Sequence, residues 1–450
     1  MLAFRRQHSR EITTVLSDFD ATGRHITELY TKAVEQLGSD KFQVRFGGLY
    51  ALEQLAQDNP AYRQVIVNVI CAYLRMPFSP TAPASKPEFA AADGRKEPGA
   101  ESETEADGIG LTWQEERQVR LTAQRILTKH LGYDRADDLQ SADPPSSRFW
   151  NDIRLNLTGA TLIDFNLANG VIGDANFHRA AFCGDADFHR AAFRGDARFG
   201  EAAFEGDALF GEATFSGDAS FPAAAFRGDA LFGEAAFSRS AGFRKAAFGG
   251  DAEFRKANFA GDAWFDKVTF TGVASFVKAT FTGDAGFRKA AFTGSAWFDK
   301  ATFSRGALFD GTAFTSDAWF GEVSFTRGAS FDRAVFTSDA WFAEATFTGD
   351  AGFGEAAFSG EAWFDKATFN RDASFGEATF TGDAGFGEVA LSGSAWFGEA
   401  TFSGGADALH FERARILSPG ASHVWPPGWR LADADGGGYT VVRANEDSGS

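Results

Sequence analysis

Residues 337–347 read TSDAWFAEATF, and the next eleven, residues 348–358, read TGDAGFGEAAF, so the two copies align without a gap. Within each copy the phenylalanines are five residues apart, and between the copies they are six apart. This alternation runs from Phe177 to Phe402 over 42 positions, of which 41 are phenylalanine and one is Leu391. Because self-similarity at a fixed period is typical of repeat architectures, the sequence predicts a long array of small structural repeats.

The phenylalanine spacing favours strands over a helix. In a helix, a step of five residues turns by about 140°, so the phenylalanines would form no single apolar stripe. Nearly every copy also contains glycine, which costs roughly 1 kcal/mol in a helix interior. In a strand, residues two apart point to the same side, and a small residue, usually alanine, stands two positions before each phenylalanine. The motif Ala-x-Phe therefore predicts a strand with alanine and phenylalanine inward and the middle residue outward.

Two five-residue units, GATLI at 159–163 and DANFH at 174–178, show the repeat in its simplest form. They resemble the units of the pentapeptide-repeat family, whose pattern is A-(D/N)-L-x-x with a central Leu or Phe. The resemblance covers about residues 155–416. It implies a mainly β fold, a right-handed quadrilateral β-helix in which four units make one coil.

This chain departs from that family pattern by a sixth residue in every second unit. A short corner such as Gly376-Glu377 alternates with a longer one such as Thr348-Gly349-Asp350. Two corners of each length close a coil of about 22 residues, and neighbouring coils are expected to lie about 4.8 Å apart.

The outward residues give an independent test of the coil length. The residue before every fourth phenylalanine is a tryptophan over one stretch, and these tryptophans recur at 22-residue intervals: Trp297, Trp319, Trp341 and Trp363. The positions between them hold Leu308, Ser330 and Gly352. A plain eleven-residue unit would not separate tryptophan from smaller residues in this way, so we expect the tryptophans to share one outer face.

The remaining chain is predicted to form an α-helical N-terminal module, a linker and two caps. Apolar residues at 3–4 spacing in ITELYTKAVEQL (26–37) indicate amphipathic helices, and the stretch 10–75 resembles the helical domain that precedes such repeats in actinobacterial members. Thr112 and Glu115 form a candidate capping box, with Gly132 as the stop. The predicted boundaries are a helical module at 1–76, a disordered linker at 77–110, a helix and N-terminal cap at 111–150, the β-helix at 151–416, and a C-terminal cap hairpin and tail at 417–450.

Composition restricts the class of protein. The formal net charge is -18, which argues against a general basic surface for nucleic acid, so no direct nucleic-acid binding is expected. Cys71 and Cys183 cannot form a disulfide framework, and no apolar run approaches twenty residues. These observations predict a cytoplasmic protein without a membrane span, and they leave a homodimer possible.

No enzyme, cofactor or metal site is expected. The run Gly352 to Ala357 matches a dinucleotide fingerprint, but Phe353 is a core position and no βαβ unit surrounds it. His178 and His189 are half a coil apart and cannot share a metal ion. Asp185, Asp207, Asp229 and Asp251 are 22 residues apart. They are interpreted as corner residues whose carboxylates accept hydrogen bonds from backbone N–H groups.

The sequence therefore predicts a non-enzymatic scaffold that presents side-chain ladders to a protein partner. The candidate partner-binding residues are Trp297, Trp319, Trp341, Trp363, Lys256, Lys278 and Lys300. Whether the tryptophans bind a partner or only stack on each other stays open. The alternative function is an acidic DNA mimic that modulates a type II topoisomerase, because the family includes quinolone-resistance proteins that bind gyrase. Residues 301–400, with 15 acids against 5 bases, fit that alternative.

Overall fold

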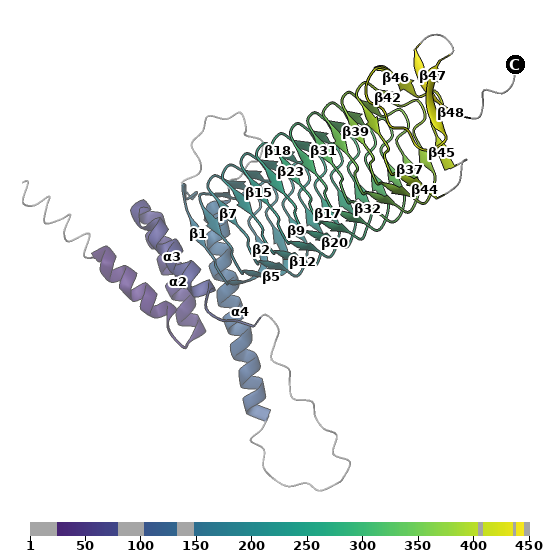
Figure 1. Cartoon of the computed structure of the whole chain (residues 1–450). Coiled ribbons are helices and arrows are strands. Elements are labelled where there is room, and N and C mark those ends of the chain that lie inside the picture. The colour runs from purple at the N-terminus through teal and green to yellow at the C-terminus, as the bar shows by residue number, and fades with distance from the viewer. Residues whose placement is uncertain (1–24, 80–102, 133–147, 404–407, 435–437, 445–450) are drawn as a thin grey trace, which may run out of the picture. The chain divides into compact units, whose positions relative to one another are not determined.

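The structure is a computed structural model of the 450-residue chain, shown in Figure 1. It describes residues 25–79, 103–132, 148–403, 408–434 and 438–444, with residues 103–111 described for the backbone only. The chain divides into two compact units, Met1–Ile163 and Asp164–Ser450. Two predicted segments lie outside the described residues: most of the linker, and the part of the helical module before residue 25.

The first unit is helical, as predicted for residues 25–74. Residues 25–37 form a helix, followed by α2 (Phe42–Asp58), the 3₁₀ turn η1 (Pro60–Tyr62) and α3 (Arg63–Leu74). Helix α3 buries Ile66, Val67, Ile70 and Leu74, so apolar spacing creates one inward stripe. Asn59 precedes Pro60 at the start of η1, but its side chain does not cap this turn, because its Nδ2 donates back to the Leu55 carbonyl at 3.1 Å.

Helix α4 (Glu103–Leu131) begins nine residues before the predicted start. The capping box at Thr112 and Glu115 is therefore wrong, since both residues lie inside the helix, and residues 103–110 are not linker. The segment ETEADGIG contains two glycines, which disfavour a helix interior, so residue propensity does not explain the longer helix. The predicted stop is confirmed: the helix ends at Leu131, and the Gly132 N–H donates to the Thr128 carbonyl at 2.8 Å.

A side chain of α4 completes the backbone bonding of the first long strand. Strand β2 spans Thr161–Asn166, and Ile163 belongs to the helical unit. The Gln124 amide donates to the Ile163 carbonyl at 2.7 Å and accepts from the Ile163 N–H at 2.9 Å. Gln124 is buried, so it replaces the backbone partner that a preceding coil would provide. This pairing protects a strand edge that would otherwise be open.

The second unit is the predicted β-solenoid, with about 22 residues per coil and four faces. Following the chain around one coil, face one runs from β4 (Ala175–Asn176) to β43 (Ala395–Trp396), and face two runs from β8 (Ala203–Phe204) to β44 (Thr401–Phe402). Face three runs from β9 (Ala208–Leu209) to β45 (Leu409–His410), and face four runs from β3 (Val171–Ile172) to β46 (Arg415–Ile416).

Most strands are two residues long and pair in parallel with the equivalent residues one coil away. On faces one and three the strand is the Ala-x pair before phenylalanine, as in β15 (Ala241–Gly242). On faces two and four it is the x-Phe pair, as in β16 (Ala247–Phe248). Within the coils, β2 and β5 (Ala181–Asp187) are longer, and β5 runs around a corner.

Stacked phenylalanines fill the interior, as the Ala-x-Phe motif predicted. Phe298 lies 4.8 Å from Phe320 in the next coil with parallel rings, and 5.4 Å from Phe309 across the coil with an edge-to-face angle of 89°. Both geometries are favourable for aromatic pairs. Phe298 and the alanine before it, Ala296, are fully buried. Each coil therefore contributes the same inward contacts, repeated along the solenoid.

Each short corner is a four-residue turn with an unusual third residue. In the corner that starts at Phe298, the Ala301 N–H donates to the Phe298 carbonyl at 3.0 Å, and Lys300 has φ 58°. Residues other than glycine rarely adopt this left-handed conformation. The third residues align from coil to coil as two columns, named here by their position. Column A follows face one and contains Arg179, Glu201, Ala223, Lys245, Lys267, Lys289, Gly311, Arg333, Glu355, Glu377 and Glu399. Column B follows face three and contains Asn169, Arg190, Glu212, Glu234, Lys256, Lys278, Lys300, Glu322, Glu344, Lys366, Glu388 and Arg413.

The C-terminal end carries the predicted hairpin. Strands β47 (Trp429–Asp433) and β48 (Tyr439–Arg443) pair antiparallel, and β48 also pairs with β46. The rings of Trp425 and Trp429 lie 6.1 Å and 5.1 Å from Phe411, the last core phenylalanine. These two tryptophans therefore cover the end of the aromatic core.

Candidate functional site

Face three holds the four predicted tryptophans as neighbours. Strands β25 (Ala296–Trp297), β29 (Ala318–Trp319), β33 (Ala340–Trp341) and β37 (Ala362–Trp363) pair in parallel and in register. The Trp319 and Trp341 rings stack with centroids 3.9 Å apart. Trp297 and Trp319 are each 36% exposed, while Trp341 and Trp363 are half-buried. We call these four side chains the Trp strip.

A glycine ends the Trp strip in the next coil. Trp363 pairs in register with Gly385, and a Cβ added at Gly385 would lie 2.3 Å from the Trp363 ring. The indole therefore lies flat over the Gly385 backbone, and its Nε1 donates to Glu361 at 3.0 Å. The same arrangement occurs on face one, where Trp264 covers Gly286. Glycine beside tryptophan thus provides the space into which the ring leans.

The predicted lysine column belongs to column B. Lys300 lies in the same coil as Trp297, whereas Lys278 and Lys256 lie one and two coils before the Trp strip. Lys256 pairs with Glu234 at 2.8 Å, and Lys300 pairs with Glu322 at 3.1 Å. Lys278 forms no ion pair with the residues that the structure describes. Two of the three predicted lysines are therefore neutralised by glutamates in adjacent coils, which leaves Lys278 as the uncompensated charge next to the strip.

Two half-buried aspartates lie at the corners that follow the Trp strip. Burial raises the pKa of Asp299, although hydrogen bonds from its own N–H and from Gly321 oppose the shift. Burial also raises the pKa of Asp365, whose Oδ1 accepts from the Gly387 N–H at 2.8 Å. The strip is therefore bordered by a surface that is already partly withdrawn from water.

The aspartate columns have the structural role that the sequence indicated. Asp185 accepts from the Asp207 N–H at 3.0 Å, and Asp207 accepts from the Asp229 N–H at 2.9 Å. Each carboxylate thus ties its corner to the next coil. Within the described ranges, no three His, Cys, Asp or Glu side chains gather as a metal site, and no helix there is long and apolar enough to cross a membrane.

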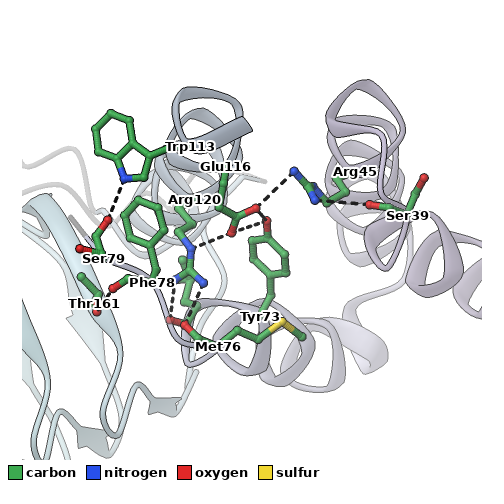
Figure 2. A network of polar contacts seen from close by, with 11 residues as sticks. Ser39, Arg45, Tyr73, Met76, Phe78, Ser79, Trp113, Glu116, Arg120 and Thr161 are labelled. Atoms are coloured by element: carbon green, nitrogen blue, oxygen red, sulfur yellow. Dashed lines mark hydrogen bonds and ion pairs between the residues drawn. The ribbon is translucent and has the colours of Figure 1, made fainter. Parts of the chain in front are cut away.

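The helical unit contains a charged network that sequence reasoning missed. Figure 2 shows Glu116 between three donors: Tyr73 Oη at 2.9 Å, Arg120 Nε at 2.7 Å and Arg45 Nη2 at 3.3 Å. Arg120, only 1% exposed, also donates to the carbonyls of Leu74 at 3.1 Å and Met76 at 2.8 Å. The network joins α2, α3 and α4. In the sequence, the sign of this network was the i, i+4 spacing of Glu116 and Arg120.

Aromatic rings enclose this network. The Arg120 guanidinium lies 4.7 Å from the Phe78 ring centroid, and Phe78 stacks on Trp113 at 6.2 Å. Burial, together with the Glu116 charge and hydrogen bond, raises the pKa of Tyr73. Nearby, burial raises the pKa of Cys71 to about 11, so its thiol is held protonated at neutral pH. The arrangement clamps three helices and provides no reactive nucleophile.

The comparisons with known proteins match the repeat region. A family model described as pentapeptide repeats in nine copies matches residues 177–225, 221–269, 265–313, 309–357 and 346–390. A search of curated proteins and a search of solved structures gave no match.

Proposed function

The chain belongs to the pentapeptide-repeat family, and from this we propose that it is a non-enzymatic, cytoplasmic scaffold that binds a protein partner along face three. A β-solenoid of this family is a repeat protein suited to protein interaction. The Trp strip is the observation that carries the proposal. Aligned aromatic side chains on a rigid backbone lose little conformational freedom on binding, and tryptophan is enriched among energetically dominant interface residues.

The charge beside the Trp strip supports a partner with some acidic character. Lys278, one coil before Trp297, lacks an acidic partner among the described side chains, whereas glutamates of adjacent coils neutralise Lys256 and Lys300. Exposed charges of this kind act mainly on the association rate and weaken with salt. Binding along the strip should therefore become slower as ionic strength rises.

A pull-down with the full chain tests this proposal. The double variant Trp319→Ala/Trp341→Ala should lose a protein that wild type recovers, because truncated interface tryptophans cost about 2 kcal/mol or more, roughly thirtyfold in affinity. The matched control is Trp264→Ala/Trp396→Ala, which removes two tryptophans from face one. Equal recovery by the wild type and both double variants would contradict a site on face three.

The DNA-mimic alternative keeps one supporting observation, the net charge of -10 over residues 301–400. A gyrase supercoiling assay separates the two proposals. Inhibition or protection of gyrase by the chain, retained in Trp319→Ala/Trp341→Ala, would favour the mimic. No effect on supercoiling would favour the scaffold.

A further inference from the structure

We propose that column A is the contact surface of an antiparallel homodimer, in which two copies of the chain lie side by side. Column A and column B follow opposite faces of the coil, eleven residues apart, so this surface is separate from the Trp strip. The inference therefore does not depend on the proposed partner of face three.

The charges of column A are self-complementary about a two-fold axis. Reading toward the C-terminal end, one coil at a time, the column holds Lys245, Lys267, Lys289, Gly311, Arg333, Glu355, Glu377 and Glu399. The axis would pass between Gly311 and Arg333. Rotation about it places Lys245 opposite Glu399 of the second copy, and Lys267 opposite Glu377. Lys289 falls opposite Glu355, so every lysine meets a glutamate.

The column A lysines lack acidic partners among the residues that the structure describes. Lys245, Lys267 and Lys289 are exposed, lie in successive coils about 4.8 Å apart, and form no ion pair with any described residue. Stacked like charges without acids between them are unfavourable. Glu377 and Glu399 are likewise exposed and unpaired in the described part of the chain. Glu355 pairs with Arg333 at 2.7 Å, so the new ion pairs are strongest at the two outer positions.

Side-chain size is complementary about the same axis. The outward residues of face one, over the same eight coils, are Gly242, Trp264, Gly286, Leu308, Ser330, Gly352, Ser374 and Trp396. The two-fold places Trp396 opposite Gly242 and Trp264 opposite Ser374. The residues that precede column A in the sequence show the same size complementarity. Arg244, Asp266 and Arg288 fall opposite Gly398, Gly376 and Gly354. Bulky side chains on one copy thus meet small residues on the other.

Two aspartates near the axis form an unfavourable contact. Asp310 falls opposite Asp332 of the second copy, and Arg333 of each copy lies beside this pair. Asp310 is also bound by Arg288 at 3.4 Å within its own chain. Asp332 forms no ion pair with the described residues, since the nearby Arg333 is bound to Glu355, so this contact costs the dimer some stability.

Column B lacks this complementarity and provides an internal comparison. Its charges read Lys256, Lys278, Lys300, Glu322, Glu344 and Lys366. An axis that sets Lys300 against Glu322 also sets Lys256 against Lys366. Two of its lysines already have acidic partners within the same chain, because Lys256 and Lys300 pair with glutamates of neighbouring coils. The antisymmetric pattern is therefore a property of one column and not of the repeat.

The size of the surface predicts a weak dimer. Eight coils span about 34 Å, and a strip roughly 15 Å wide would bury about 500 Å² per copy, below the usual 800 Å². Ion pairs at exposed positions are screened by salt. We therefore expect self-association at low ionic strength that is lost at high ionic strength.

Sedimentation equilibrium of the full chain tests the proposal by charge exchange. Lys245→Glu/Lys267→Glu makes the column acidic at both ends, and Glu377→Lys/Glu399→Lys makes it basic at both ends. Each variant alone should dimerise about tenfold or more weakly than wild type, because like charges then face each other. A mixture of the two variants should associate again, since each acidic end then meets a basic one.

Circular dichroism of every variant checks that the fold is intact, and Glu344→Lys/Glu388→Lys is the matched charge change in column B. That control should dimerise like wild type. A wild-type chain that stays monomeric at low salt would overturn the proposal. A dimer whose affinity neither pair of charge substitutions changes would also overturn it. A mixture of the two variants that fails to associate would do the same.

Discussion

The helical unit and the solenoid are each stabilised by a different kind of internal contact. The helical unit depends on contacts that occur once, such as Arg120 bound to Glu116 and to the carbonyls of Leu74 and Met76. The solenoid repeats one set of contacts in every coil, as in the ring stack from Phe276 through Phe298 to Phe320.

Because the two units are stabilised differently, they also differ in which residues can change without loss of stability. In a repeat protein, stability approximates a sum over repeats and their interfaces, so an outward position is free to change if the inward ones are kept. Columns on the outside can therefore acquire their own pattern, as the Trp strip and column A have done. In the helical unit, the charged residues are themselves the packing contacts.

The largest effect is expected where a charge enters the repeated core. Phe298→Asp should cost more than about 5 kcal/mol, because it removes a fully buried ring and buries a carboxylate. Phe298→Leu should cost only about 1–1.5 kcal/mol, since Leu391 already occupies an equivalent core position. Thermal melts followed by circular dichroism compare the two, and similar melting temperatures would contradict the inward placement of Phe298.

The unique contacts of the helical unit should be nearly as sensitive to a single change. Arg120→Met should cost about 3–5 kcal/mol, because it leaves Glu116 and two backbone carbonyls without their buried donor. The matched control is Arg125→Met, an exposed arginine of the same helix. Urea denaturation monitored by the helical signal measures both, and equal midpoints would show that the network does not hold the helices.

These two regions also differ in how far the sequence predicts them. The alternation in Ala-x-Phe was enough to predict the strands and the core, because a period of two fixes which positions point inward and which point outward. The left-handed corners were not predictable, since residues such as Lys300 and Glu344 carry no preference for positive φ. The Glu116 network depends on carbonyls at the end of α3, more than forty residues away, so only its i, i+4 pair was visible.

The pairing of Tyr73, Arg45 and Arg120 around one carboxylate could not be read from any local pattern. The Trp strip and the lysines of column B were predicted as neighbours because the coil length fixes their alignment. Their ion pairs were not predicted, since these depend on where each side chain turns within the corner.

Acid should weaken the helical unit through Glu53. Burial opposes ionisation of Glu53, but hydrogen bonds and charges from Lys129 and His130 outweigh it and hold its pKa below the usual value of 4.5. A depressed pKa stabilises the fold above the unfolded-state pKa, and this contribution is lost as pH falls through the folded-state pKa. Glu53→Gln should therefore flatten the acid dependence of the helical melting temperature, with Asp58→Asn as the matched control. An unchanged acid profile would contradict this role.

The smallest effect is expected at the corners of the solenoid. Ala223 has φ 54°, a conformation that costs residues other than glycine about 1–2 kcal/mol. Ala223→Gly should therefore be neutral or slightly stabilising. Ala343→Gly, at the preceding position of an equivalent turn, should destabilise by about 0.5–1 kcal/mol. Melting temperatures of the two variants that fall in the reverse order would show that the corners are not strained.

The central claim is that the Trp strip serves a partner and contributes little to folding. The most direct test measures two free energies on Trp319→Ala/Trp341→Ala: unfolding in urea, and binding to the protein that wild type recovers. Losing one stacked pair should cost the fold only about 0.5–1.5 kcal/mol, while affinity should fall by about thirtyfold or more. Unchanged affinity together with a large loss of folding stability would contradict the claim.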